Sequence, residues 1–135
     1  MPTWRTNLAT GIDTKTGKRK KYQGFEKSEY CNFYNELIND EKLIKAMKEK
    51  GYKGLFVSHP CHDANINDFK GNDVIEIAKK GVEYNELFSK GALLVTDYSS
   101  VVFDFVYLNK EDSISVSKIM FVNDSMSEKI IRKKI

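Results

Sequence analysis

The sequence has few of the residues that cross-link a small fold or interrupt its helices and strands, with 2 cysteines and 2 prolines among its 135 residues. Two cysteines cannot form a disulfide framework, so we expect reduced thiols in a cytoplasmic protein. No apolar run approaches the roughly 20 residues that cross a bilayer. The opening MPTWRTNLATG lacks the continuous apolar segment that is typical of a signal peptide.

An excess of charge of one sign is also missing, since the formal net charge is +3. So small an excess does not indicate a nucleic-acid binder, and we predict no nucleic-acid partner, although an anionic ligand would not be repelled. The hydrophobic fraction of 41% is ordinary for a globular protein. The length suits one domain with a real core.

Basic residues gather in one segment, Lys15–Tyr22, where five of eight residues are Lys or Arg. Such a run could contact a phosphate backbone or an anionic membrane surface. More often it is a solvated loop, and its aromatic neighbours are too few for a base-stacking platform. We therefore expect residues 1–27 to form a long loop that carries a solvated basic run.

Helical periodicity begins after residue 27. Apolar residues recur on one helical face from Tyr30 to Ile38, and Ser28 stands where an N-cap is expected. Asp40 can cap a second helix, and Gly51 follows where a left-handed residue ends such a helix. Residues 84–90 and 101–108 also favour helices.

Short apolar runs predict buried strands between these helices. The predicted strands are residues 54–58, 74–77 and 92–96. Residues 61–72 read as a polar loop. Because helices alternate with continuous apolar strands, the sequence predicts an α/β fold with a parallel sheet flanked by helices.

One predicted strand ends in Thr96, Asp97, Ser99 and Ser100. Ligands of open parallel sheets bind outside the carboxyl ends of the strands. Both serines fall at the start of the next helix, where free N–H groups and the helix dipole favour an anion. Ser99 could simply cap its own helix, but capping does not explain the crowding of polar residues. We therefore favour a phosphate site.

A second predicted strand also ends in residues that could bind a ligand or take part in catalysis, Ser58-His59-Pro60. His59 could be a general base or a phosphate contact, because its pKa lies near working pH. A histidine that is merely hydrogen-bonded in a loop is the plainer alternative. Zinc binding by His59, Cys61, His62 and Asp63 is not expected, since the paired spacing of structural zinc sites is missing.

Several segments occur in an order that carries a family resemblance: MPTWR (1–5), FEKSEY with YNELINDEKLIKAMKEKGY (within 25–52), FVSHP (56–60) and YNELFSKGALLVTDYSSVVFDFVYL (84–108). They resemble the C-terminal nucleotide-binding half of the CDP-glycerol glycerophosphotransferases, the teichoic-acid primases and polymerases of Gram-positive bacteria. The resemblance covers about residues 1–110, and TDYSS-x-x-FD is its strongest motif.

This resemblance implies an enzyme of GT-B architecture, in which two Rossmann-like lobes face a cleft. Residues 1–110 would be part of the nucleotide-diphosphate-binding lobe, and residues 111–135 a divergent C-terminal tail. The implied reaction transfers glycerol phosphate from CDP-glycerol to a lipid-linked teichoic acid acceptor and releases CMP, without a cofactor. The implied location is peripheral, at the inner face of the cytoplasmic membrane.

The resemblance also assigns roles to residues. Arg5 and the Ser99/Ser100 helix terminus would hold the donor diphosphate, and no metal ion is expected. His59 matches the family's HP histidine, a candidate for acid/base work or for stabilising the transferring phosphate. The remaining members of the expected donor site are Thr96, Asp97 and Asp104.

Some features depart from the family pattern. The chain begins at MPTWR, without the N-terminal lobe that carries another catalytic histidine, and it diverges after Lys110. We therefore expect a gene fragment or a frame-shifted remnant, with weak or absent turnover alone. Two alternatives stay open: a non-catalytic nucleotide- or polyanion-binding module, and a GT-B enzyme with another nucleotide-sugar donor.

Overall fold

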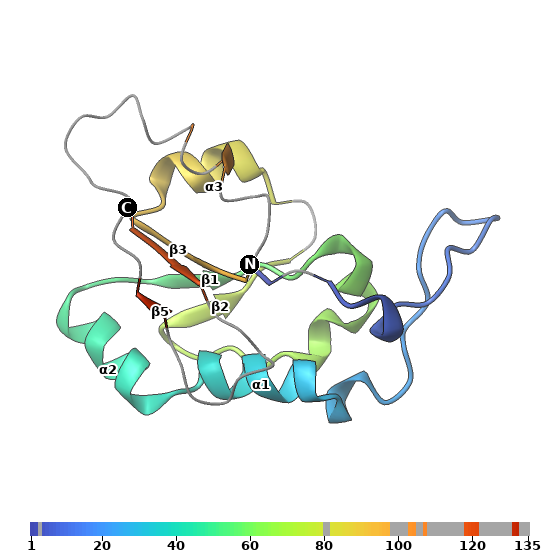
Figure 1. Ribbon diagram of the computed structural model, residues 1–135, viewed down its shortest axis with the longest axis horizontal. Coiled ribbons are helices and arrows are strands. Elements are labelled where there is room, and N and C mark those ends of the chain that lie inside the picture. The colour runs from blue at the N-terminus through green and yellow to red at the C-terminus, as the bar shows by residue number, and fades with distance from the viewer. Residues whose placement is uncertain are drawn as a thin grey trace. The chain divides into compact units, whose positions relative to one another are not determined.

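The computed structural model describes residues 1–2, 4–79, 82–97, 103–104, 107, 118–121 and 131–132. The chain divides into two compact units (Figure 1). The first unit is Trp4–Lys80, and the second joins Met1–Thr3 to Gly81–Ile135. The expected helix over residues 101–108 is described only at residues 103, 104 and 107, which are helical.

Two helices of the first unit confirm the predictions from capping. Helix α1 spans Glu29–Ile38, and the Ser28 hydroxyl accepts a hydrogen bond from the backbone N–H of Cys31. Helix α2 spans Glu41–Glu49 and is capped in the same way by the Asp40 carboxylate. Gly51 then has a φ of 70°, the left-handed conformation that glycine adopts without strain. The local sequence therefore sets where both helices begin and end.

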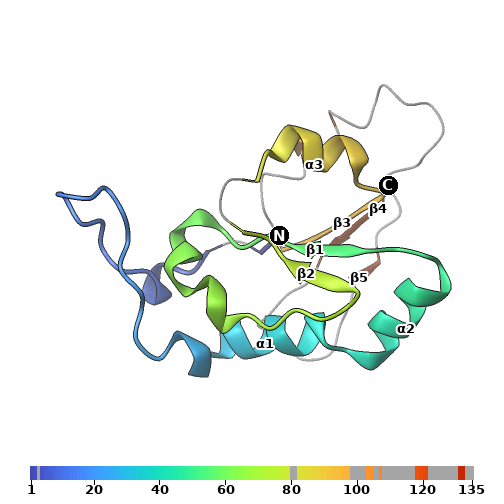
Figure 2. The ribbon, with the colours of Figure 1, turned by 180° about the vertical axis from the view of Figure 1, so that it is seen from behind.

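The sheet of the first unit is a parallel pair, β1 (Gly54–Phe56) and β2 (Ile75–Ile77). Both ribbon views show α1 running along one side of this pair (Figure 2). The core between them is strongly aromatic, and its buried members are Phe25, Tyr30, Cys31, Tyr34, Ile38, Phe56, Phe69, Val74 and Ile75. The first unit therefore has a hydrophobic core of its own.

The expected polar loop over residues 61–72 is wrong in its first part, because Pro60–Asp68 forms a 3-10 helix, η3. Pro60 sits in its first turn, where its fixed φ suits a helix and its missing N–H costs nothing. His62 and Asn65, the buried residues of η3, are polar and three residues apart. In a 3-10 helix residues at this spacing lie on one face. The helix therefore has no apolar stripe that sequence periodicity could detect.

The expected long loop over residues 1–27 is interrupted by local structure. It contains two 3-10 turns, η1 (Thr6–Leu8) and η2 (Phe25–Lys27). An antiparallel bridge also joins Ile12 to Arg19. Each of these is short, so the segment has little regular structure, but it is not featureless.

The second unit contains helix α3 (Tyr84–Lys90) and strand β3 (Leu93–Thr96), both close to the predicted ranges. Strand β3 pairs in parallel with β4 (Lys118–Phe121), which pairs antiparallel with β5 (Ile131–Arg132). The sequence did not predict strands after residue 110. The α/β character and the parallel pairing are confirmed. Among the residues that the structure describes, no helix has the length and apolar character to cross a membrane.

Candidate functional site

The residues predicted for the site fall in both units. Arg5 and His59 belong to the first unit, and Thr96, Asp97 and Asp104 to the second. Ser99 and Ser100 lie outside the described residues.

His59 stands at the N-cap of η3, where its side chain is fixed by the backbone that follows. Its Nδ1 accepts a hydrogen bond from the Cys61 N–H at 3.1 Å. A neutral imidazole whose Nδ1 accepts must carry its proton on Nε2. Burial lowers the pKa of His59; Asp63 opposes this effect and the positive charge of Arg19 adds to it. The side chain is thus a neutral imidazole that presents an Nε2–H donor.

Trp4 covers one side of this imidazole. The two rings stack with centroids 5.9 Å apart and planes 22° apart. The guanidinium carbon of Arg19 lies 5.8 Å from the centroid of the Trp4 ring, within the range of a cation–π contact. Arg19, Trp4 and His59 therefore form a chain of contacts that runs from the basic run at residues 15–22 to the segment that follows β1.

His62 holds the segment on which Trp4 lies. Its Nε2 accepts a hydrogen bond from the backbone N–H of Arg5 at 3.2 Å. The side chain is 1% exposed and packs against the rings of Phe25 and Tyr30, at centroid distances of 5.1 and 5.3 Å. Its Nδ1 has no hydrogen-bond partner among the described residues. Burial, aided by the charges of nearby basic groups, lowers the pKa of His62 to about 4.

Arg5 places its guanidinium over the ring of Tyr30, 5.4 Å from the centroid. A guanidinium is planar, permanently charged and suited to bidentate contact with phosphate oxygens. Trp4 stacks on His59 and Arg5 is bonded to His62. The first unit therefore holds the backbone of Arg5 against η3, the helix that His59 caps, while the Arg5 guanidinium lies over Tyr30 of α1.

Sequence reasoning missed the structural part played by His62 and by two further residues of η3. Asn65 bonds the backbone N–H and C=O of Tyr22, at 2.9 and 3.0 Å, and also donates to Asp68 at 2.8 Å. Asp68 pairs with Lys21 at 2.9 Å. A signal was present in the sequence, because His59, His62, Asn65 and Asp68 recur every three residues.

In the second unit, two predicted residues lie buried at the end of β3. Thr96 is 2% exposed, and its hydroxyl donates to the backbone carbonyl of Met1 at 2.5 Å. Asp97 is 3% exposed. The Met1 amine donates to the Val95 carbonyl at 2.7 Å, and burial lowers the pKa of that amine to about 5, against the opposing charge of Asp97. Asp104 is exposed. Their roles in donor binding stay predictions.

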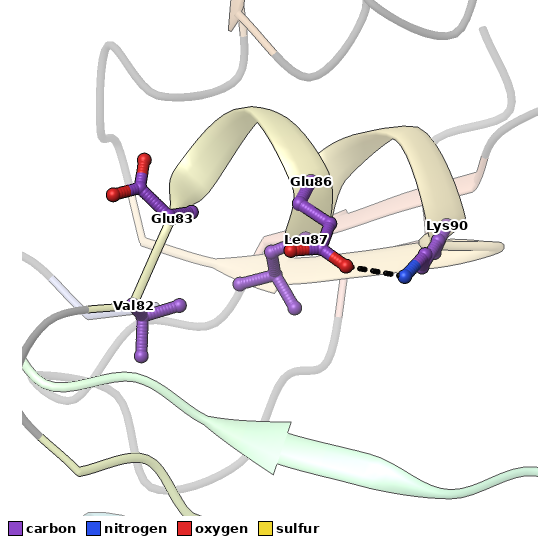
Figure 3. Close-up of a pocket in the computed structure, with 5 residues that line it drawn as sticks. All are labelled: Val82, Glu83, Glu86, Leu87 and Lys90. Atoms are coloured by element: carbon purple, nitrogen blue, oxygen red, sulfur yellow. Dashed lines mark hydrogen bonds and ion pairs between the residues drawn. The ribbon is translucent and has the colours of Figure 1, made fainter.

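A shallow pocket of about 220 Å³ lies along α3 (Figure 3). Its lining residues are Val82, Glu83, Glu86, Leu87 and Lys90. Glu86 and Lys90 are joined by an ion pair of 2.5 Å within the helix. None of the predicted site residues lines the pocket. In the described part of the chain, no group of three or more potential ligands could hold a metal ion.

Comparison with known proteins decides the family. The model of the CDP-Glycerol:Poly(glycerophosphate) glycerophosphotransferase family matches residues 1–111. The chain belongs to this family. The resemblance found in the sequence motifs is thereby confirmed, and the match ends close to the point at which the motifs end.

Two curated relatives in this family come from Bacillus. The chain is 42% identical over 110 residues to the minor teichoic acid biosynthesis protein GgaB of Bacillus subtilis strain 168. It is 36% identical over 77 residues to the teichoic acid poly(ribitol-phosphate) polymerase of Bacillus spizizenii. These matches cover 82% and 56% of this chain, but the chain spans 12% of the length of each relative. No solved structure matches the chain.

Proposed function

We propose that this chain is part of the nucleotide-binding lobe of a teichoic acid phosphotransferase with GT-B architecture. The reaction moves glycerol phosphate from CDP-glycerol to a hydroxyl of a lipid-linked polymer and releases CMP. The observation that carries the proposal is the family match over residues 1–111, which includes both motifs that meet at the start of η3. The parallel pairing of β3 with β4 is consistent with such a lobe.

The chemistry is in-line attack at phosphorus, so positioning and charge neutralisation dominate catalysis. His59 is suited to charge neutralisation. With Nδ1 occupied by the Cys61 N–H, its Nε2–H donates to a phosphoryl oxygen of the donor. The same tautomer cannot take a proton at Nε2, which argues against a general base. Arg5 supplies a permanent positive charge to the diphosphate.

The acceptor and the location follow from the same proposal. A lipid-linked polyol-phosphate chain lies at the membrane, so the protein acts peripherally at the inner face of the cytoplasmic membrane. The family description names poly(glycerophosphate), and one relative is named a poly(ribitol-phosphate) polymerase, so both names support an anionic polymer as the acceptor.

Donor binding tests the proposal directly. CDP-glycerol and CMP are titrated calorimetrically into the 135-residue chain and into the variant Ser99→Ala/Ser100→Ala. We expect the variant to bind CDP-glycerol about tenfold more weakly, because it loses charge-assisted contacts to the diphosphate. Ser89→Ala, an exposed serine of α3, is the control and should bind like the wild type. Equal affinity of all three proteins would refute the phosphate site.

A panel of UDP-sugars tests the choice of donor. Tighter binding of a UDP-sugar than of CDP-glycerol would favour another GT-B enzyme. Turnover is measured as CMP release with a lipid-linked acceptor. We expect weak or absent release by the chain alone and recovery when the N-terminal part of a family member is supplied. Absence of release in both cases would count against the phosphotransferase.

A further inference from the structure

The segment between η1 and η2 carries a concentration of positive charge that the proposed reaction has not used. We call residues Lys15–Lys21 the basic loop. It contains no acidic residue, and only Lys21 has an ion-pair partner, Asp68, in the described part of the chain. The side chains of Lys15, Lys18 and Lys20 are exposed. Three cations therefore face solvent without a carboxylate to neutralise them.

The basic loop has a defined backbone. The Asp13 N–H donates a hydrogen bond to the Lys18 carbonyl at 2.9 Å, and the Gly17 N–H donates one to the Asp13 carbonyl at 2.7 Å. Gly17 has a φ of 65°, a left-handed conformation that closes the turn. The Asp13 carboxylate, which lies just before the loop, accepts a hydrogen bond from the backbone N–H of Lys15 and so stabilises the turn. These bonds give the backbone that carries the lysines a defined turn conformation.

The loop is also fixed beside His59. Arg19 donates to the backbone carbonyl of Thr10 and lies over the ring of Trp4, which in turn stacks on His59. The other end of the loop is held by Lys21 on Asp68, in the same helix η3 that His59 caps. Both ribbon views show this blue segment projecting from the rest of the first unit (Figures 1 and 2). Contacts of Arg19 and Lys21 therefore fix the basic loop to the part of the first unit that carries the imidazole.

We propose that the basic loop binds the phosphodiester backbone of the acceptor polymer and guides its terminal hydroxyl toward His59; this inference rests on the proposed function. A polyol-phosphate chain carries one negative charge per repeat, so successive lysines can contact successive phosphates. Thr14 and Thr16, both exposed beside these lysines, add hydroxyl donors to phosphate oxygens. A free phosphate would need only one such cation.

A membrane surface fits the loop less well. Among the residues of the turn, Ile12, at 58% exposed, is the large apolar side chain available for insertion. Stable attachment to a bilayer commonly combines basic residues with a buried apolar group or lipid chain. Moreover, the contact chain through Arg19 and Trp4 ends on His59, where a polymer end must react.

The test uses the full 135-residue chain and the triple variant Lys15→Gln/Lys18→Gln/Lys20→Gln. Its control, Lys27→Gln/Lys42→Gln/Lys50→Gln, removes the same charge from exposed lysines elsewhere that have no ion-pair partner in the described residues. The probes are glycerol-phosphate oligomers of one and eight repeats, and binding is followed by fluorescence of Trp4, the single tryptophan. Circular dichroism and CDP-glycerol titration verify that each variant keeps its fold and its donor site.

We expect the eight-repeat oligomer to bind more tightly than the single repeat, with an affinity that falls steeply with salt. The loop variant should lose about tenfold or more in affinity and much of the salt dependence, while the control stays within about twofold. Equal losses in the two variants would overturn the proposal. So would binding to phosphatidylglycerol vesicles with none to the oligomer. CDP-glycerol affinity unchanged by the loop variant separates this result from failure of the donor site.

Discussion

The indole ring of Trp4 lies against the imidazole of His59, with centroids 5.9 Å apart and planes inclined by 22°. This contact removes solvent from one face of the imidazole, and burial is the main reason why the pKa of His59 lies below its ordinary value of 6.5. A residue of the opening MPTWR motif thereby tunes a residue of the HP motif. The two motifs act as one physical unit.

The first prediction concerns that coupling. In Trp4→Ala the imidazole becomes more exposed, so the pKa of His59 should rise toward 6.5. The measurement is an NMR titration of the His59 ring protons. Tyr52→Ala removes another exposed aromatic ring of the first unit and should leave the titration unchanged. A His59 pKa that is the same in Trp4→Ala and in the wild type would contradict the assigned cause.

The second prediction concerns the effect of neighbouring charges on the pKa of His59. Arg19 disfavours the imidazolium, and Asp63 favours it. The pKa of His59 should therefore rise in Arg19→Gln and fall further in Asp63→Asn. Both changes should shrink in high salt, since Arg19 and Asp63 are only partly buried and ions can screen their charges. Shifts of the same sign in the two variants would show that conformational change, not charge, sets the titration.

The third prediction separates two roles for His59 in turnover. The amide nitrogen of glutamine can replace the Nε2–H donor but cannot exchange a proton at working pH. With the N-terminal part of a family member supplied, His59→Gln should keep more of the CMP-release rate than His59→Ala. A donor role predicts a difference of about tenfold, a typical value for a hydrogen bond to a charged group. Equal and complete loss in both variants, with folding intact, would favour acid/base catalysis.

How far the sequence predicts the fold depends on whether the signal is local. Ser28, Asp40 and Gly51 act on the backbone within a few residues, so their capping and left-handed roles could be read directly. Helix η3 was missed, because its inward residues are polar, recur without an apolar stripe and are stabilised by the distant Tyr22 and Arg5. Strand β4 has four residues and β5 has two, so neither is long enough to show a periodic pattern. Strand β4 also pairs with β3, which lies far from it in the sequence.

The candidate site also combines features that could be predicted from the sequence with contacts between distant residues that could not. Its motif residues, such as Arg5 and His59, were identified by resemblance. The structure adds the contacts that connect them, which run through Trp4 and His62. The buried state of His62 could not be foreseen, since a histidine among polar neighbours is more often exposed than enclosed by aromatic rings.

The fourth prediction uses that burial. The pKa of His62 is about 4 in the folded protein and about 6.5 in the unfolded chain. Between these values the unfolded state binds the extra proton, so the free energy of unfolding should fall as the pH drops from about 6.5 to about 4. The full effect is about 3 kcal/mol, read from urea unfolding at several pH values. In His62→Gln, which keeps an acceptor for the Arg5 N–H, the slope should become shallower by the contribution of His62, while the lowered pKa values of His59 and of the Met1 amine keep a remainder. A wild-type slope unchanged by the variant would assign it to other groups.

The fifth prediction tests the link between η3 and the end of the basic loop. Asn65 is 2% exposed and makes three hydrogen bonds, two to the backbone of Tyr22 and one to Asp68. Asn65→Ala leaves these groups without their partner and should lower the free energy of unfolding by about 2 kcal/mol. Asn67→Ala, two residues away and exposed, should change it by less than about 0.5 kcal/mol. Tyr22 adjoins Lys21, the last residue of the basic loop. Asn65→Ala should therefore also weaken binding of the eight-repeat oligomer more than Asn67→Ala does. Equal oligomer affinities of the two variants would show that the Asn65–Tyr22 hydrogen bonds do not hold the loop in place.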